Sequence, residues 1–104
     1  MKRQKAPQAK GRFKESTFQA EAEYAESMFQ STLGDIEASV AALKRSLEWK
    51  PTYAPAILSM GSVEYQRGRR AEGRKLFESL LSLPESTPEL PEIIDEAEQI
   101  GCPQ

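Results

Sequence analysis

Apolar residues recur at three- and four-residue steps in five stretches of the chain, and this spacing is typical of one face of an α-helix. The first stretch begins at Ser16 or Thr17, either of which can cap a helix, and it ends at Gly34. Gly34 suits a left-handed turn, and Asp35 after it suits the cap of a second helix. The apolar face of this first helix consists of Phe18, Ala22, Ala25, Phe29 and Leu33.

Four further helices are predicted at 36–49, from 52 or 53 to 67, at 70–83 and at 88–100. Pro51, Gly68 and Pro84 separate them, because proline and glycine interrupt helical backbone geometry. Thr87 is the expected cap of the last helix, with Pro88 in its first position. Five helices and no strand pattern place the chain in the all-α class.

Charge is distributed unevenly along the chain, although the formal net charge is only -2. Residues 1–14 contain no acid and six cations, namely Lys2, Arg3, Lys5, Lys10, Arg12 and Lys14. The C-terminal twenty residues have no base and six acids, namely Glu85, Glu89, Glu92, Asp95, Glu96 and Glu98. Because residues 1–15 are polar and show no helical apolar period, we expect a basic, flexible tail there.

The composition argues against catalysis. The chain has no histidine and a single cysteine, Cys102, so the common general base, the His and Cys metal sites and the nucleophile–base pairs are missing. No glycine-rich phosphate motif is present. We therefore expect a protein that is not an enzyme and that uses neither a metal nor another cofactor. No stretch is long and apolar enough for a membrane span, and a cytoplasmic location is expected.

The chain also resembles itself after a shift of 34 residues. Each unit then reads as helix, glycine turn, helix and proline. The shift pairs Ala20 with Ala54, Tyr24 with Leu58, Phe29 with Val63, Gly34 with Gly68, Leu43 with Phe77, Leu47 with Leu81, and Trp49 with Leu83.

The period and the order of these units resemble the tetratricopeptide repeat (TPR) family. The second unit has Ile57, Met60 and Gly61 where the family has Trp, Leu and Gly, whereas Glu64 replaces a family aromatic. The resemblance implies an α-solenoid of two antiparallel helix hairpins plus a fifth, capping helix. The domain then spans 16–101, with repeats at about 20–53 and 54–87 and the capping helix at about 88–100.

The resemblance also implies a concave groove lined by the first helix of each repeat. The groove-facing positions are Glu21, Tyr24, Met28, Ser31, Leu58, Ser62, Tyr65 and Gln66. A carboxylate clamp for acidic C-termini is disfavoured, because Tyr24, Met28 and Ser59 stand where that subclass has its clamp residues. An alternative role for Tyr24, Met28 and Leu58 is simple packing against the neighbouring helix.

The favoured function is a protein-interaction adaptor that binds a peptide or helix of another protein in this groove. The first alternative is a protein that binds nucleic acid or an anionic surface electrostatically, through the basic tail and a basic turn. Of these two partners, nucleic acid is the less favoured. That turn contains Arg67, Arg69, Arg70, Arg74 and Lys75. The second alternative is a self-associating structural module or a fragment of a longer repeat array. Phe13 and Phe18 are candidates for a contact of the first helix with another copy or with a partner, although a place in the protein's own core is favoured for both.

Overall fold

The computed structural model describes residues 12–101, with side chains from Glu15 onward, and all regular structure in this range is helical. The helices are α1 (Arg12–Thr32), α2 (Ile36–Trp49), α3 (Ala54–Gln66), α4 (Arg70–Leu80) and α5 (Leu90–Gly101). The predicted all-α class is therefore confirmed for the described residues, and the predicted bounds of the second helix match α2.

The start of the first helix differs from the prediction. α1 begins at Arg12 rather than at Ser16 or Thr17, so it includes the end of the segment that we expected to be a flexible tail. After Gly11 nothing interrupts a helix, and Arg, Lys and Glu are good helix formers. The rest of the predicted tail, residues 1–11, lies outside the described residues.

The last two helices are shorter than predicted. α4 ends at Leu80 instead of residue 83, and the next three backbone N–H groups bond carbonyls only three residues back, which marks the end of an α-helix. α5 begins at Leu90 instead of Pro88, because Glu89 has a positive φ of 59° and lies outside helical geometry. Thr87 therefore does not cap α5 with its side chain; its backbone carbonyl accepts the N–H of Leu90 at 3.2 Å.

The two glycine turns have the same geometry. Gly34 and Gly68 have φ values of 84° and 87°, a left-handed conformation that favours glycine. The Gly34 N–H donates to the backbone carbonyl of Ser31, and the Gly68 N–H donates to the backbone carbonyl of Tyr65. Three further bonds from a backbone N–H to a backbone carbonyl recur 34 residues later. The bond from Leu33 to Phe29 is matched by Arg67 to Val63, the bond from Asp35 to Gln30 by Arg69 to Glu64, and the bond from Ser39 to Asp35 by Gly73 to Arg69.

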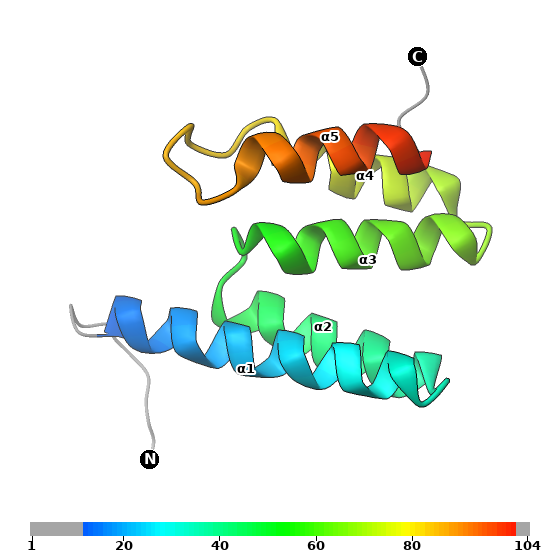
Figure 1. Cartoon of the computed structure of the whole chain (residues 1–104), viewed down its shortest axis with the longest axis horizontal. Helices are drawn as coiled ribbons and strands as arrows, with labels where there is room; N and C mark the ends of the chain where they lie inside the picture. The colour runs from blue at the N-terminus through cyan, green and yellow to red at the C-terminus, as the bar shows by residue number, and fades with distance from the viewer. Residues whose placement is uncertain (1–11, 102–104) are drawn as a thin grey trace.

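Each glycine turn reverses the chain, so α2 runs back along α1 and α4 runs back along α3 (Figure 1). α5 packs against both α3 and α4, and α2 contacts α3. One apolar cluster joins α3, α4 and α5 and consists of Ala54, Ile57, Phe77, Leu80, Ile93 and Ala97. A second joins α2 and α3 and consists of Val40, Leu43, Ala56 and Met60.

Small residues bring the paired helices close together. A Cβ on Gly73 of α4 would lie 2.7 Å from the carbonyl oxygen of Gly61 on α3, so only glycine fits this contact. Between α1 and α2, the buried hydroxyl of Ser46 donates to the Ala20 carbonyl at 2.7 Å. The equivalent of Ser46 in the second pair is Leu80, which is fully buried.

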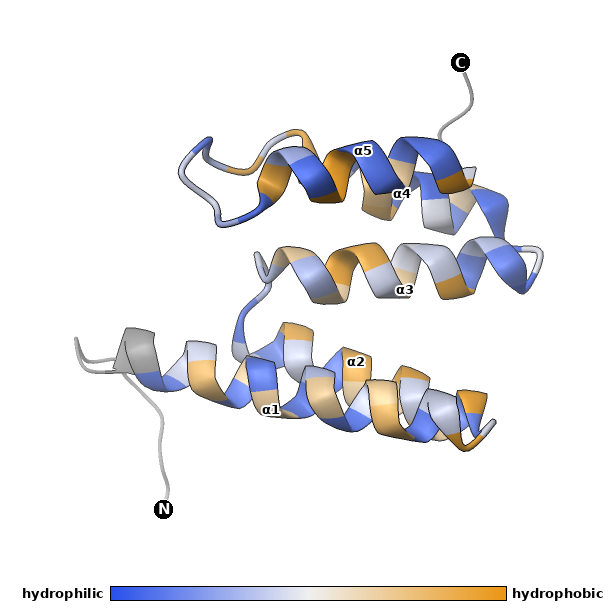
Figure 2. Cartoon of the chain, viewed as in Figure 1, coloured by the Kyte–Doolittle hydropathy of each residue, from blue (hydrophilic) through white to orange (hydrophobic). Residues whose placement is uncertain are grey.

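The apolar face predicted for the first helix points away from the rest of the molecule. Its five residues are all exposed, and the exposed fractions of Phe18, Phe29 and Leu33 are 69%, 57% and 63%. α1 instead packs on α2 through small residues, Ala20 and Ser27. The favoured core role of Phe18 is therefore wrong, because among the described helices none covers this side of α1 (Figure 2). The side chain of Phe13 lies outside the described ones.

Candidate partner-binding cleft

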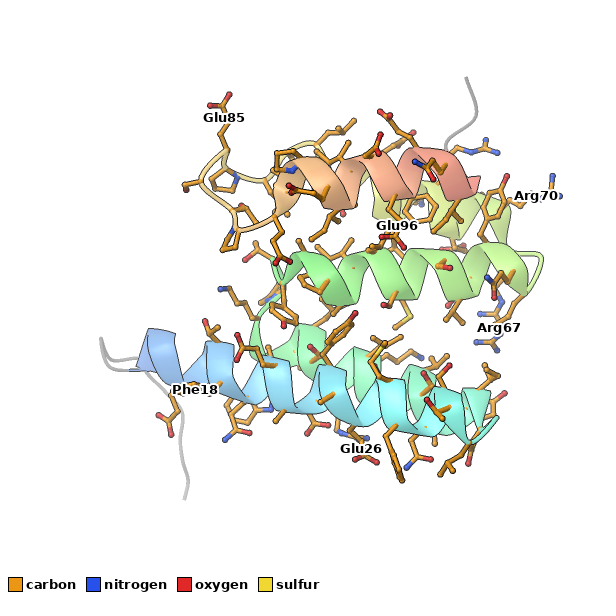
Figure 3. The ribbon with its side chains drawn as sticks, viewed as in Figure 1. Phe18, Glu26, Arg67, Arg70, Glu85 and Glu96 are labelled. Carbon is orange, nitrogen blue, oxygen red and sulfur yellow. The ribbon has the colours of Figure 1, made fainter. Side chains whose placement is uncertain are left out.

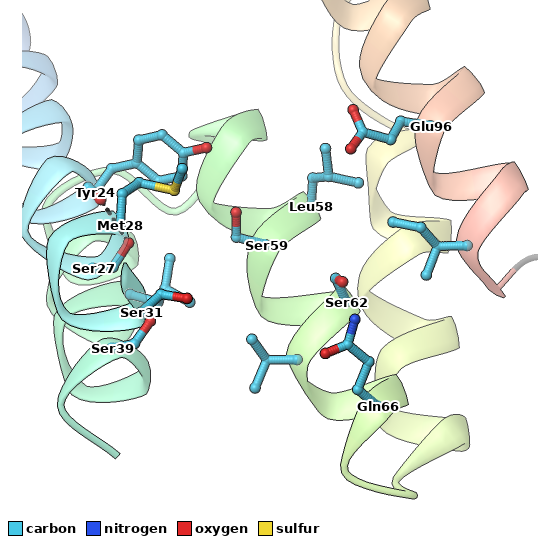
Figure 4. A pocket seen from close by; sticks show the side chains of 13 residues that line it. Tyr24, Ser27, Met28, Ser31, Ser39, Leu58, Ser59, Ser62, Gln66 and Glu96 are labelled. Atoms are coloured by element: carbon cyan, nitrogen blue, oxygen red, sulfur yellow. Dashed lines mark hydrogen bonds between the residues drawn. The ribbon is translucent and has the colours of Figure 1, made fainter. Parts of the chain in front are cut away.

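A cleft of about 350 Å³ lies between α1 and α3 (Figure 4). α1 and α3 form its two long walls, with contributions from α2 and α5. Its lining consists of Tyr24, Ser27, Met28, Ser31, Ser39, Leu43, Leu58, Ser59, Ser62, Val63, Gln66, Glu96 and Ile100. Two lining positions correspond in the 34-residue repeat, since Tyr24 and Met28 of α1 are the equivalents of Leu58 and Ser62 of α3.

Six of the eight predicted groove residues line this cleft. They are Tyr24, Met28, Ser31, Leu58, Ser62 and Gln66. Met28 remains 51% exposed, so packing against a neighbouring helix does not account for its whole side chain. Tyr24 and Leu58 are half-buried and contribute to the walls as well as to the packing of the helices.

The other two predicted residues lie elsewhere. The Tyr65 ring packs 6.5 Å from the Phe77 ring, and Gly101 of α5 lies so close to it that an added Cβ would approach the ring to 2.8 Å. Tyr65 therefore joins α3 to α4 and α5 instead of facing the cleft. Glu21 lines a separate cavity of about 250 Å³, together with Tyr53 and Glu89. These two placements correct the prediction, because helical spacing does not show which neighbour a flanking residue meets.

Seven lining residues are not among the predicted groove positions, although Ser59 was noted as a clamp position: Ser27, Ser39, Leu43, Ser59, Val63, Glu96 and Ile100. Helical spacing offered a signal for Ser27 and Ser59, which lie one turn from Tyr24 and Ser62 on their helices. No comparable signal existed for Glu96 and Ile100, because α5 reaches the cleft only through its packing on α3.

The cleft combines apolar anchors with small polar groups and carries little charge. Glu96 is the single ionisable side chain in its lining apart from Tyr24. The Tyr24 ring is held edge-on against the Tyr53 ring, with centroids 5.8 Å apart and an interplanar angle of 80°. Ser27 donates its hydroxyl to the Tyr24 carbonyl at 2.6 Å, which leaves a small, internally bonded side chain on the wall. Such a wall permits a backbone or a side chain to approach closely.

The separate cavity beside Glu21 has a distinct electrostatic character. Burial raises the pKa of the Tyr53 phenol above its ordinary value of 10.0, and the carboxylates of Glu21 and Glu89 raise it further. Tyr53 therefore stays neutral at physiological pH. No group of metal-ligating side chains is found among the described residues.

The predicted basic turn does not form a single cluster of unengaged cations. Arg67 lies 3.9 Å from Glu37, and the Arg70 guanidinium lies 5.3 Å from the centre of the Tyr65 ring. Arg69 lies 3.5 Å from a carboxylate oxygen of the buried Glu64, and that oxygen has no hydrogen bond that would satisfy it further. The remaining two members, Arg74 and Lys75, are exposed on α4.

Comparison with models of known protein families, with curated proteins and with solved structures found no match to this chain. No helix in the described part of the chain is long and apolar enough to cross a membrane.

Proposed function

We propose that this protein is an adaptor that binds a peptide or short helix of a partner protein in the cleft between α1 and α3. The observation that carries this proposal is that six of the eight predicted groove residues, drawn from both repeat units, line one cleft. Packing of the chain alone leaves this lining partly open, as the half-exposed Met28 shows. Exposed, flexible methionine is common at protein surfaces that bind peptides.

The architecture that we propose with it is a TPR-like solenoid of two antiparallel hairpins with α5 as its cap. Support comes from the two glycine turns, whose hydrogen bonds recur at the 34-residue offset. Further support comes from the small residues that line the helix contacts, such as Gly61 and Gly73. In such a solenoid the first helices of the hairpins, α1 and α3, form the binding surface, and these two helices form the walls of the cleft.

The lining favours a neutral or basic, partly apolar segment. The cavity is near the lower end of the range of about 300–1,000 Å³ that is typical of ligand sites, so it holds a few side chains rather than a whole helix. Tyr24, Met28 and Leu58 offer apolar contact area, whereas Ser31 and Ser62 allow close approach. Since the described lining contains no cation, it gives an acidic segment no charge partner.

Two substitutions that fill the cleft without removing core packing test this proposal. Ser31 is exposed and Ser62 is half-buried, so the pair Ser31→Arg/Ser62→Arg places two long side chains in the cleft. The matched control is Ser79→Arg/Ser86→Arg, which makes the same change at exposed positions that do not line the cleft. Helicity and thermal unfolding are compared first, to show that both variants are folded.

Displayed random peptides of about 15 residues are selected on the unmodified full chain, and binding is followed by fluorescence anisotropy and by NMR amide shifts. We expect shifts at cleft residues and at least a tenfold loss of affinity in the cleft variant, because two bulky cations block the site. The control variant should bind as the unmodified chain does. Equal binding by all three proteins, or shifts confined to other surfaces, would show that the cleft is not the binding site.

A further inference from the structure

The exposed apolar face of α1 is a second surface, separate from the cleft. This stripe consists of Phe18, Ala22, Ala25, Phe29 and Leu33. At 100° per residue it points about 150° away from the cleft residues of the same helix, so both surfaces can be occupied together. Figure 3 shows Phe18 and Glu26 on the side of α1 that faces away from the other helices. The largest contiguous apolar patch on a protein surface is often functional.

The internal repeat shows what this face does elsewhere in the chain. Ala22 and Phe29 of α1 are the equivalents of Ala56 and Val63 of α3. Ala56 and Val63 pack against the preceding hairpin, in the apolar cluster that includes Val40 of α2. Two positions of this face therefore make an inter-hairpin contact in α3, whereas among the described helices nothing occupies the face in α1.

We infer that the stripe pairs with the stripe of a second copy of this chain, in antiparallel orientation about a two-fold axis beside Ala25. This register places Phe18 opposite Leu33 of the other copy and Ala22 opposite Phe29. Phe29 next to the centre then meets the small Ala22. The axis falls between positions 25 and 26, so the two Ala25 side chains lie side by side next to it, where the helices approach most closely. A face that complements itself in this way is what a two-fold symmetric interface requires.

Head-to-tail stacking of copies is a poorer arrangement. It would place α1 on the outer face of α5, where Glu92, Asp95 and Glu98 are exposed. Glu21 and Glu26 flank the stripe on α1, so acids would meet acids across such a contact. The blue colour along much of the visible side of α5 illustrates this polar outer face (Figure 2). Two-fold pairing also brings flanking acids of α1 near the axis, but it covers the apolar stripe and leaves the acids of α5 in solvent.

The size of the contact predicts a weak dimer. The stripe spans about 22 Å at a rise of about 1.5 Å per residue. From the exposed fractions of its large residues, pairing buries roughly 500 Å² per copy, or about 1,000 Å² in total, which is close to the lower limit for a specific interface. We therefore expect a dissociation constant on the order of 10 μM. Since the two Glu26 side chains flank the axis and repel each other, added salt should strengthen the association.

The first measurement is sedimentation equilibrium of the full chain from about 5 to 500 μM, which brackets the expected dissociation constant. Leu33→Glu removes an apolar contact twice per dimer and should weaken association by about 100-fold. Leu81→Glu is a matched control, because Leu81 is 64% exposed and Leu33 is 63% exposed, and it should change the constant less than twofold. A chain that stays monomeric at the highest concentration, or equal effects of the two variants, would overturn the inference.

A cross-link tests the register. In a Cys102→Ser background, Ala25→Cys places two thiols next to the proposed axis, and a disulfide between them requires a Cα separation of about 4.4–6.8 Å. Mild oxidation should yield a covalent dimer of Ala25→Cys, whereas the control Ala41→Cys, exposed on α2, should remain mostly monomeric. If Ala25→Cys cross-links no faster than Ala41→Cys, the proposed pairing is wrong. Peptide binding in the cleft should persist in Leu33→Glu, so failure of the dimer and failure of the adaptor function are distinguishable.

Discussion

Replacement of Gly73 by alanine tests the contact that sets the spacing between α3 and α4. The new Cβ would lie 2.7 Å from the carbonyl oxygen of Gly61 and 3.1 Å from the backbone nitrogen of Tyr65. Both neighbours are backbone atoms, so no rotamer change relieves the clash and the two helices must separate. Such overpacking typically costs about 1–3 kcal/mol, and a clash with backbone belongs near the upper end of that range.

The same substitution also has a favourable effect, because alanine is about 1 kcal/mol better than glycine inside a helix. We therefore expect Gly73→Ala to lower the free energy of unfolding by about 1–2 kcal/mol. For a domain of this size the midpoint of thermal unfolding should fall by roughly 5–15 °C. The assay is thermal and urea unfolding followed by circular dichroism at 222 nm.

Ala71→Gly, at an exposed position of the same helix, provides the control. It measures the intrinsic helix preference alone and should cost about 1 kcal/mol. Gly73→Ala has the opposite intrinsic preference, so destabilisation of both variants isolates the steric contribution. An unchanged or raised midpoint for Gly73→Ala would refute the close approach of α3 and α4.

Two further predictions concern charge and pH. Arg69→Ala should destabilise the fold by about 1–3 kcal/mol in urea unfolding, because it leaves the buried Glu64 carboxylate without its cation. Adding Glu64→Met should restore most of this loss, because it removes the buried charge. A double variant as unstable as Arg69→Ala would contradict this account. The raised pKa of Tyr53 means that the folded protein holds this proton more tightly than the unfolded chain, so the stability should decrease as pH rises above 10.0. Tyr53→Phe should show a smaller decrease over this range in urea unfolding, and an identical pH profile would show that Tyr53 does not contribute.

The sequence by itself determined the class of the fold and most helix boundaries. The bounds of α2 followed from Asp35 and Pro51, because capping and proline effects act within a few residues of the chain. The turns at Gly34 and Gly68 followed equally well, since a left-handed backbone position strongly favours glycine. The late start of α5 did not follow, because it depends on the positive φ of Glu89, a conformation that glutamate rarely adopts.

The candidate cleft was predictable in part. Tyr24 and Leu58, two of the positions that the family resemblance implied, both line the cleft. Tyr65 was misplaced, since its ring is drawn toward Phe77 and Gly101 by the packing of α5, which lies outside the repeat. Glu96 was missed for the same reason.

Only the tertiary structure decided which face of α1 is buried. Helical periodicity identified an apolar face containing Phe18 and Phe29, but periodicity does not reveal whether a neighbouring helix exists to cover it. α2 packs on the opposite side of α1, where Ala20 and Ser27 permit close contact and the Ser46 hydroxyl bonds to the backbone. Local rules fix where helices begin and end, whereas the choice of buried face depends on the shape and number of the neighbours, which residues distant in the sequence supply.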